Sequence, residues 1–416
     1  MNATSKKLSY VTAFTGRRDS YQLPVALAEH GRLAAFATCF YRDRGLAGRL
    51  ARLFPRRRSP SHQRHAAGLE QVSIETMEFT NLAARLGRRL MQASKVAVWE
   101  DNAFARRAVA LARAHRASLL LYEFQADWAF RQPMKHTAAR ILFQFHPHPD
   151  LEHPLLIADG ERYPQFLPDI RRNTRANLSL RYREHTRSAW LHADHVIVAS
   201  HFTAHSLHAA GCPADKITVV PYGCNFRAAP AGLGGGGSNG EGRPCFLYVG
   251  SGSQRKGLHH LLEAWGASRA SGTHELIIIA RQVEPELRSA LARTKAVRHL
   301  TGVDGDELVR WYARARAFVL PTLSEGFGHV FLEALACGCP VIGTRNSMLP
   351  DFAEAQAHIR YVEPGNVESI RAEIDRVANL SAADPFFDTT QVRASVRNYT
   401  WDRFRGGIEA VLSRFD

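Results

Sequence analysis

Short apolar runs alternate with segments of helical spacing along the second half of the chain. Leu258, Leu261, Leu262 and Trp265 recur at intervals that place them on one face of a helix. Because strands and helices that alternate in this way form a parallel sheet covered on both faces, the pattern predicts an α/β domain. The expected strands are 245–249, 275–280, 298–302, 317–321, 340–344 and 359–362, and the expected helices include 307–314 and 366–379.

The first half of the chain follows a similar but less regular pattern. An apolar run that ends at Gly16 is followed by a helical stretch that ends at Gly31. Further apolar runs recur up to the middle of the chain, so we expect a second unit of the same class. The expected strands are 8–14, 118–124, 140–145, 195–199 and 217–220, and the expected helix is 21–29.

A glycine-rich segment separates the two halves. Residues 232–242 read Gly-Leu-Gly-Gly-Gly-Gly-Ser-Asn-Gly-Glu-Gly, a composition that cannot build a packed element and is typical of a flexible linker. With 416 residues, the chain also exceeds the length at which a single core keeps growing. We expect one domain over 1–228, a linker over 229–243, a second domain over 244–390 and a terminal segment over 391–416.

The stretch 319–340 carries the most specific chemistry. It reads Val-Leu-Pro-Thr-Leu-Ser-Glu-Gly-Phe-Gly-His-Val-Phe-Leu-Glu-Ala-Leu-Ala-Cys-Gly-Cys-Pro, which is a strand end, a turn on Gly326 and Gly328, and a helix. The glycines let the backbone approach a ligand, and the helix N-terminus suits phosphate oxygens. Glu325 can accept hydrogen bonds from sugar hydroxyls and Glu333 from a ribose. These features indicate a nucleotide-sugar site; the alternative is an acidic turn before an ordinary core helix.

This stretch resembles the Glu-x7-Glu signature of the family-4 glycosyltransferases, which are retaining enzymes of the GT-B fold. The resemblance is close over 193–350 and holds only in outline over 1–190. It implies two Rossmann-like domains that face a cleft. The N-terminal domain would bind the acceptor and the C-terminal domain the nucleotide sugar, and 391–416 would form a helix that crosses back onto the first domain.

The resemblance also implies the reaction. A sugar would pass, with retention of configuration, from a nucleotide-diphosphate sugar to a saccharide or lipid-linked acceptor in polysaccharide or glycolipid synthesis. Neither a cofactor nor a metal is expected. Asp304-Gly-Asp306 is similar to the Asp-x-Asp metal motif of another glycosyltransferase fold, but it directly precedes an expected helix, where an Asp is the preferred N-cap.

The basic loop after the first strand of the second domain resembles the family's diphosphate clamp. Lys256 matches the family's lysine, whereas Ser251 stands at the usual arginine position and Arg255 precedes the lysine directly. Cations aimed at a leaving diphosphate stabilise the transition state more than the ground state. A solvated basic loop is the alternative. The full set of expected donor-binding residues is Gly250, Ser251, Arg255, Lys256, Val303, Gly326, Phe327, Gly328 and Glu333.

Two segments of the first domain are expected at the cleft. The strand 140–145 ends at His146-Pro-His148-Pro, and the family carries a histidine near the transferred sugar at a comparable strand end. His146 is the closer match and His148 the alternative, so His146 and Glu325 are the expected catalytic residues. Gly16, Arg17 and Arg18 fall in the family's acceptor region, where an arginine can hold an anionic acceptor.

The net charge of +15 belongs almost wholly to the first half, because residues 1–200 alone carry +14. Such asymmetry favours a polyanionic partner: a membrane surface, a nucleic acid or an acidic substrate. Within 42–58, four apolar residues share one helical face beside several arginines, as in a helix that lies on an anionic membrane. A short core helix with basic ends is the alternative.

The cysteines and the absence of long apolar runs further limit the class of protein. None of the six cysteines forms a CxxC pair, which favours buried thiols over zinc. No apolar run approaches the ~20 residues that span a bilayer, and the N-terminus lacks a signal-peptide pattern, so we expect a cytoplasmic protein that can also associate with the inner face of the membrane. The alternatives are a GT-B epimerase or phosphorylase, or a non-enzymatic polyanion-binding protein. A nucleic-acid partner is not expected, because no aromatic residues interleave with the basic ones.

Overall fold

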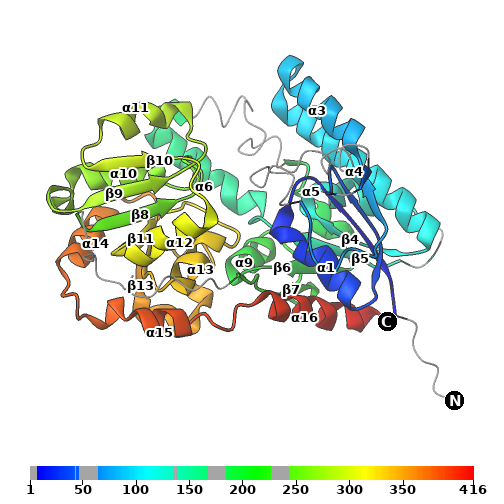
Figure 1. The fold of residues 1–416 in the computed structure, drawn as a ribbon. Coiled ribbons are helices and arrows are strands. Elements are labelled where there is room, and N and C mark those ends of the chain that lie inside the picture. Colours follow the sequence, from blue (N-terminus) through cyan, green and yellow to red (C-terminus); the bar gives the residue numbers. More distant parts are fainter. Residues whose placement is uncertain are drawn as a thin grey trace.

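Two parallel β-sheets, each from a different half of the chain, organise the protein (Figure 1). The computed structural model describes residues 7–42, 44–45, 64–134, 136, 138–166, 184–225 and 243–416. All pairings between neighbouring strands are parallel, and helices cover the sheets. The prediction of an α/β protein with two Rossmann-like domains is confirmed.

The first sheet has the strand order β3-β2-β1-β4-β5-β6-β7. Its buried strands are almost wholly apolar, as expected for a parallel sheet covered on both faces. The strands are β1 (Tyr10–Phe14), β2 (Leu33–Thr38), β3 (Ile74–Thr76), β4 (Ser118–Tyr122), β5 (Arg140–Gln144), β6 (His195–Val198) and β7 (Ile217–Val219), and the helices are α1 (Gln22–Glu29), α3 (Glu78–Leu90), α4 (Ala93–His115), α5 (Glu123–Phe130), α6 (Pro149–Arg162) and α9 (His201–Ala209).

The second sheet has the order β10-β9-β8-β11-β12-β13. Its order reverses between β8 and β11, and the order of the first sheet reverses between β1 and β4. Ligands of open α/β sheets bind at such points, beyond the carboxyl ends of the strands. The strands are β8 (Cys245–Val249), β9 (Glu275–Ile279), β10 (Val297–Leu300), β11 (Ala317–Leu320), β12 (Val341–Gly343) and β13 (Ile359–Tyr361), and the helices are α10 (Leu258–Ala267), α11 (Pro285–Arg293), α12 (Gly305–Arg314), α13 (His329–Ala336), α14 (Val367–Asn379) and α15 (Thr389–Ala394).

The last helix, α16 (Trp401–Leu412), lies along the first domain beside α1 (Figure 1). The side chain of Arg32 is fully buried there. Its Nε donates to Glu409 Oε2 at 2.6 Å and its Nη2 to Asp416 Oδ2 at 2.7 Å. The C-terminal segment therefore packs on the first domain, where the buried guanidinium of Arg32 binds two of its carboxylates.

The structure departs from the sequence-based elements in a few places. The expected strand 118–124 ends at Tyr122, because Glu123 begins α5 and its carboxylate accepts a hydrogen bond from the backbone N–H of Phe145. The pattern also failed to predict the strands β2 and β3 and the helices α3, α4, α5, α6 and α9 of the first domain. The expected linker 229–243 lies outside the described residues except for Arg243, and most of the expected amphipathic helix 42–58 does so as well.

Candidate active site

A cavity of about 610 Å³ lies between the two domains, within the size range of small-ligand sites. From the first domain it is lined by the turn after β1 and by Phe145 at the end of β5, and from the second domain by α12 and α13. The cavity therefore has one wall from each domain, as expected for the cleft between the two domains of a GT-B fold. The lining residues that concern the chemistry are Arg17, Arg18, Asp19, Leu308, Tyr312, His329 and Glu333.

Glu325 and Lys256 form a close ion pair at the carboxyl ends of β11 and β8. The Nη1 of Arg255 lies 3.3 Å from the same carboxylate oxygen, Oε2, and donates to the carbonyl of Ser324 at 2.8 Å. Burial alone would raise the pKa of Glu325, but the charges of Arg255 and Lys256 hold it at about 2. The carboxylate is therefore ionised throughout the physiological range and sits between the two expected clamp cations.

His146 reaches this group from the other domain. Its Nδ1 lies 2.6 Å from Oε1 of Glu123, a carboxylate with no exposed surface. The electrostatic interaction of the histidine with Glu325 also lowers the pKa of that carboxyl, after the larger effects of Arg255 and Lys256. His148 serves a different purpose, because it caps α6: its Nδ1 accepts a hydrogen bond from the N–H of Asp150 at 3.2 Å. Of the two candidate histidines, His146 is thus the one beside the acidic turn.

The turn Glu325–Gly328 fits tightly against the first domain. A Cβ on Gly326 would lie 2.2 Å from the carbonyl oxygen of Phe145, so only glycine allows this approach. The carbonyl of Gly326 accepts hydrogen bonds from the hydroxyls of Ser200 and Thr203, the latter at 3.0 Å. Gly328, with φ of 85°, is the N-cap of α13, and Phe327 is buried behind the turn. The two domains therefore touch at the point where the sequence places the transferred sugar.

Glu333 faces the cavity from the middle of α13. The phenol of Tyr312 on α12 donates to its Oε2 at 3.3 Å. Burial raises the pKa of Glu333. A carboxylate in this position has room in the cavity for a polar partner, as a ribose would provide.

His329 is a site residue that the sequence analysis missed, although it stands between the two expected glutamates. It is the first residue of α13, lines the cavity and stacks on the ring of Tyr222 at 4.8 Å. Burial lowers its pKa to about 4. The imidazole is therefore neutral near pH 7 and can donate or accept a hydrogen bond beside the charged group.

The turn after β1 has an unusual backbone. Asp19, Ser20 and Tyr21 all have positive φ, at 45°, 51° and 66°. Such left-handed conformations cost of order 1–3 kcal/mol each for residues other than glycine, and they concentrate at functional sites. The turn holds Asp19 and Arg18 in the cavity wall, and the guanidinium of Arg18 lies 4.9 Å from the centre of the Phe124 ring.

Asp19 should make stability depend on pH. Burial raises its pKa to about 6, against the opposing hydrogen bond from Tyr122. The folded protein thus holds a proton that the unfolded chain releases, so this stabilisation is complete below about pH 4 and is lost as the pH rises through 6. Asp19→Asn should raise the free energy of unfolding at pH 8 by up to about 3 kcal/mol and leave it unchanged at pH 4.

Urea unfolding at the two pH values measures this effect. Asp402→Asn is the matched control, because the side chain of Asp402 is 85% exposed and should shift stability little at either pH. If Asp19→Asn has the stability of the wild type at both pH values, ionisation of Asp19 at pH 8 does not destabilise the folded protein, and the prediction is wrong.

Of the other expected site residues, some line the cavity and some do not. Arg17 is exposed and lines it, whereas Gly16 at the start of the same turn does not. Gly250, Ser251 and Val303 are not among its lining residues, and Ser251 is exposed next to β8. The expected N-cap role of Asp304 is confirmed, since its carboxylate accepts from the N–H groups of Asp306 and Glu307.

Comparison with known proteins gives consistent matches in both halves. Residues 243–379 match the family model described as glycosyl transferases group 1, and residues 78–227 match the model for glycosyltransferase family 4. The O-antigen chain mannosyltransferase B of Escherichia coli is 29% identical over 180 residues, which are 39% of this chain and 45% of that protein. The MMP alpha-(1->4)-mannosyltransferase of Mycolicibacterium hassiacum is 26% identical over 165 residues, 38% and 40% of the two chains. The chain thus spans less than half the length of these curated relatives.

Solved structures share the whole fold. Sucrose-phosphate synthase from Thermosynechococcus elongatus superimposes with a TM-score of 0.62 at 16% identity, covering 98% of this chain and 99% of that one. HepE from Anabaena, solved in complex with UDP and glucose, superimposes with a TM-score of 0.57 at 14% identity over 98% and 100%. The two family models match separate segments that together cover most of the sequence, and the GT-B fold extends over both domains, so the comparisons support a glycosyltransferase of the GT-B fold.

Proposed function

We propose that the protein transfers a sugar from a nucleotide-diphosphate sugar to an acceptor hydroxyl, with retention of configuration and without a metal ion. The observation that carries this proposal is the meeting of Glu325, Lys256 and His146 at the cleft, with Glu333 in the adjoining cavity. The complex of HepE with UDP and glucose supports a nucleotide sugar as the class of donor.

In this proposal, the cations of the loop after β8 take the place of a metal. Lys256 and Arg255 already converge on one carboxylate oxygen in a largely buried setting. A departing diphosphate gains negative charge, and cations fixed in place beforehand stabilise that charge without reorganisation. Glu325 shares them with the diphosphate and accepts from hydroxyls of the transferred sugar.

The acceptor would enter from the first domain. Its hydroxyl oxygen forms a bond to the anomeric carbon on the face from which the diphosphate leaves, while the bond from that carbon to the phosphate oxygen breaks. The hydroxyl proton passes to the departing phosphate oxygen, so no protein base is required. Arg17 and Arg18 line the acceptor side of the cavity and suit a saccharide or lipid-linked acceptor that carries an anionic group.

Glu333→Ala should abolish nucleotide-induced stabilisation, because it removes the carboxylate that would hold the ribose. Thermal unfolding is followed with UDP, GDP, ADP and their sugar conjugates, with and without EDTA. A nucleotide at 100 times its dissociation constant should stabilise the wild type by about 2.7 kcal/mol, and Mg²⁺ added after EDTA should not increase this stabilisation. The exposed Glu354→Ala is the control.

The outcomes separate the alternatives. Equal stabilisation of wild type and Glu333→Ala would remove Glu333 from the donor site, and a loss of stabilisation with EDTA that added Mg²⁺ restores would contradict metal-independent transfer. In turnover assays, release of an epimerised sugar without acceptor, or of a sugar phosphate with inorganic phosphate, would assign an epimerase or a phosphorylase instead.

We also propose that α3 brings the protein to an anionic membrane. Phe79 and Leu90 at its two ends are 80% and 87% exposed, and Leu82 and Leu86 between them are more than half exposed. Arg85, Arg88 and Arg89 lie on the same helix. Figure 1 shows α3 at the periphery of the first domain, where an apolar stripe beside arginines can enter a lipid headgroup layer. No helix in the described parts of the chain has the length and apolar character needed to cross a membrane.

Vesicle flotation tests this contact. The wild type should float with anionic vesicles at low salt, and Phe79→Ser with Leu90→Ser should weaken binding at least tenfold, since each side chain is worth about 1.5–3 kcal/mol when buried. Leu191→Ser, at a site 57% exposed outside α3, is the control. Failure of the wild type to float, or self-association through α3 in size-exclusion chromatography without lipid, would overturn the proposal.

A further inference from the structure

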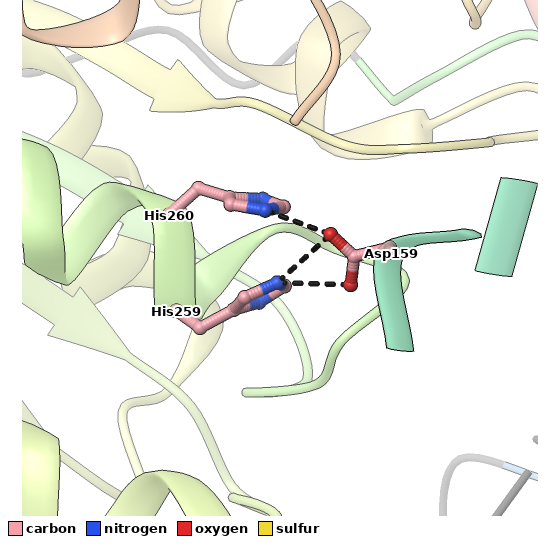
Figure 2. A group of neighbouring side chains, drawn as sticks. All are labelled: Asp159, His259 and His260. Carbon is pink, nitrogen blue, oxygen red and sulfur yellow. Dashed lines mark hydrogen bonds and ion pairs between the residues drawn. The ribbon is translucent and has the colours of Figure 1, made fainter. Parts of the chain in front are cut away.

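Three metal-ligating side chains meet between the two domains, outside the cavity described above. Asp159 near the end of α6 faces His259 and His260 in the first turn of α10 (Figure 2). Among the described residues, these three form the one group of histidine, cysteine and acidic side chains arranged to hold a metal ion. They are 5%, 6% and 0% exposed.

The donor atoms point toward one another. The Nε2 of His260 lies 2.8 Å from Oδ1 of Asp159, and the Nε2 of His259 lies 3.1 Å from Oδ2. Figure 2 shows both imidazoles turned toward the same carboxylate from one side. Neighbouring side chains on a helix normally diverge by about 100°, so their convergence on one carboxylate is a specific feature of this helix start.

We propose that Asp159, His259 and His260 bind one Zn²⁺ ion that links the two domains. Two imidazole nitrogens and one carboxylate oxygen are ligands that zinc prefers, and a water can take the fourth position. Tetrahedral bonds of ~2.0–2.1 Å place ligand atoms about 3.3 Å apart, and the three donor atoms here lie within 4.8 Å of one another. Small ring rotations therefore open the space that the ion needs.

The surroundings also suit a metal. Gln254 donates from Nε2 to Oδ2 of Asp159 at 2.8 Å and to the carbonyl of Leu156 at 3.0 Å, so it orients the carboxylate as an outer-shell partner does. The rings of Tyr163 and Phe166 cover His259 at 4.7 and 4.8 Å.

Because its ligands come from both domains, the ion would have a structural role. His259 and His260 belong to the second domain and Asp159 to the first, so the complete ligand set exists only when the domains are together. Gln254 directly precedes Arg255 and Lys256, the cations of the candidate active site. Bound zinc would thus fix both the relative placement of the domains and the loop that holds these cations. This inference goes beyond the proposed transfer reaction and does not depend on it.

Zinc titration of the chelator-treated full chain tests the proposal, with bound metal measured by mass spectrometry. We expect one equivalent in the wild type. Asp159→Asn and His260→Gln, which keep side-chain size, should weaken affinity by more than the ~10–100-fold expected for loss of the outer-shell partner in Gln254→Ala. His201→Ala is the control, because that ring is 75% exposed on another helix.

X-ray absorption of the zinc-loaded wild type needs no variant and so remains informative if a variant unfolds. It should show nitrogen and oxygen neighbours at ~2.0–2.1 Å with outer-shell scattering from two imidazoles. Sulfur neighbours at ~2.3 Å would assign the metal to cysteines instead. That result, less than one equivalent in the wild type, or unchanged affinity in both ligand variants would overturn the proposal and leave a hydrogen-bonded contact between the domains.

Discussion

Replacing Lys256 with methionine is expected to lower kcat by about 100- to 1,000-fold, the usual cost of removing one preorganised group that stabilises developing charge. Lys256 is the cation in closest contact with Glu325, and the side chain is only 13% exposed. Methionine keeps much of the length of the stem but supplies no charge to the leaving diphosphate. Initial rates with saturating donor and acceptor measure the effect.

A matched variant separates this effect from a general loss of positive charge. Lys295→Met removes the same charge from an exposed position in the second domain and should leave kcat unchanged within about twofold, because exposed charges are well screened. A Lys256→Met enzyme that turns over within threefold of the wild type would remove this lysine from the reaction. A fall in folded fraction, followed by circular dichroism, is corrected before rates are compared.

Arg32→Met is expected to lower the free energy of unfolding by about 3–5 kcal/mol, the range found when one partner of a buried ion pair is removed. The guanidinium is fully buried and is shared by Glu409 and Asp416, whose side chains are 17% and 16% exposed. Its loss leaves two nearby carboxylates without their common partner and loosens α16 from the first domain. Urea unfolding measures the change.

Arg298→Met gives the comparison for an exposed pair. Arg298 lies 3.5 Å from Glu275, and its side chain is 52% exposed, so its loss should cost no more than about 1 kcal/mol. If both variants lose similar stability, the buried arrangement at α16 adds nothing beyond an ordinary surface ion pair.

The second domain could be predicted closely because its signals are local. Around residues 319–340, the apolar run, the two glycines and the following helical spacing each depend on nearby residues. β11 and α13 accordingly fall where the pattern places them. The positions of Glu325 in the turn and Glu333 on the helix could be predicted for the same reason.

The first domain was harder to predict because tertiary contacts decide its elements. Glu123 extends an apolar run that favours strand, yet it starts a helix and uses its carboxylate to hold Phe145 and His146. The apolar face of α3 is exposed to solvent, whereas an apolar face at helical spacing normally packs against the core. No sequence spacing connects Asp159 with His259, which are 100 positions apart and meet only after both domains have folded.

The ion pairs between Arg32 and the C-terminal segment affect how the protein folds during its synthesis. Arg32 and Glu409 are separated by 377 positions, and the whole second domain lies between them. At ~5–20 residues per second, a ribosome needs about 20–75 s to synthesise that interval. For this time the nascent first domain has an arginine inside it without its carboxylate partners and a helix face that α16 does not yet cover. The docking of α16, which completes the first domain, therefore cannot occur before residues 401–412 have been synthesised. A chaperone can bind the incomplete first domain during that interval.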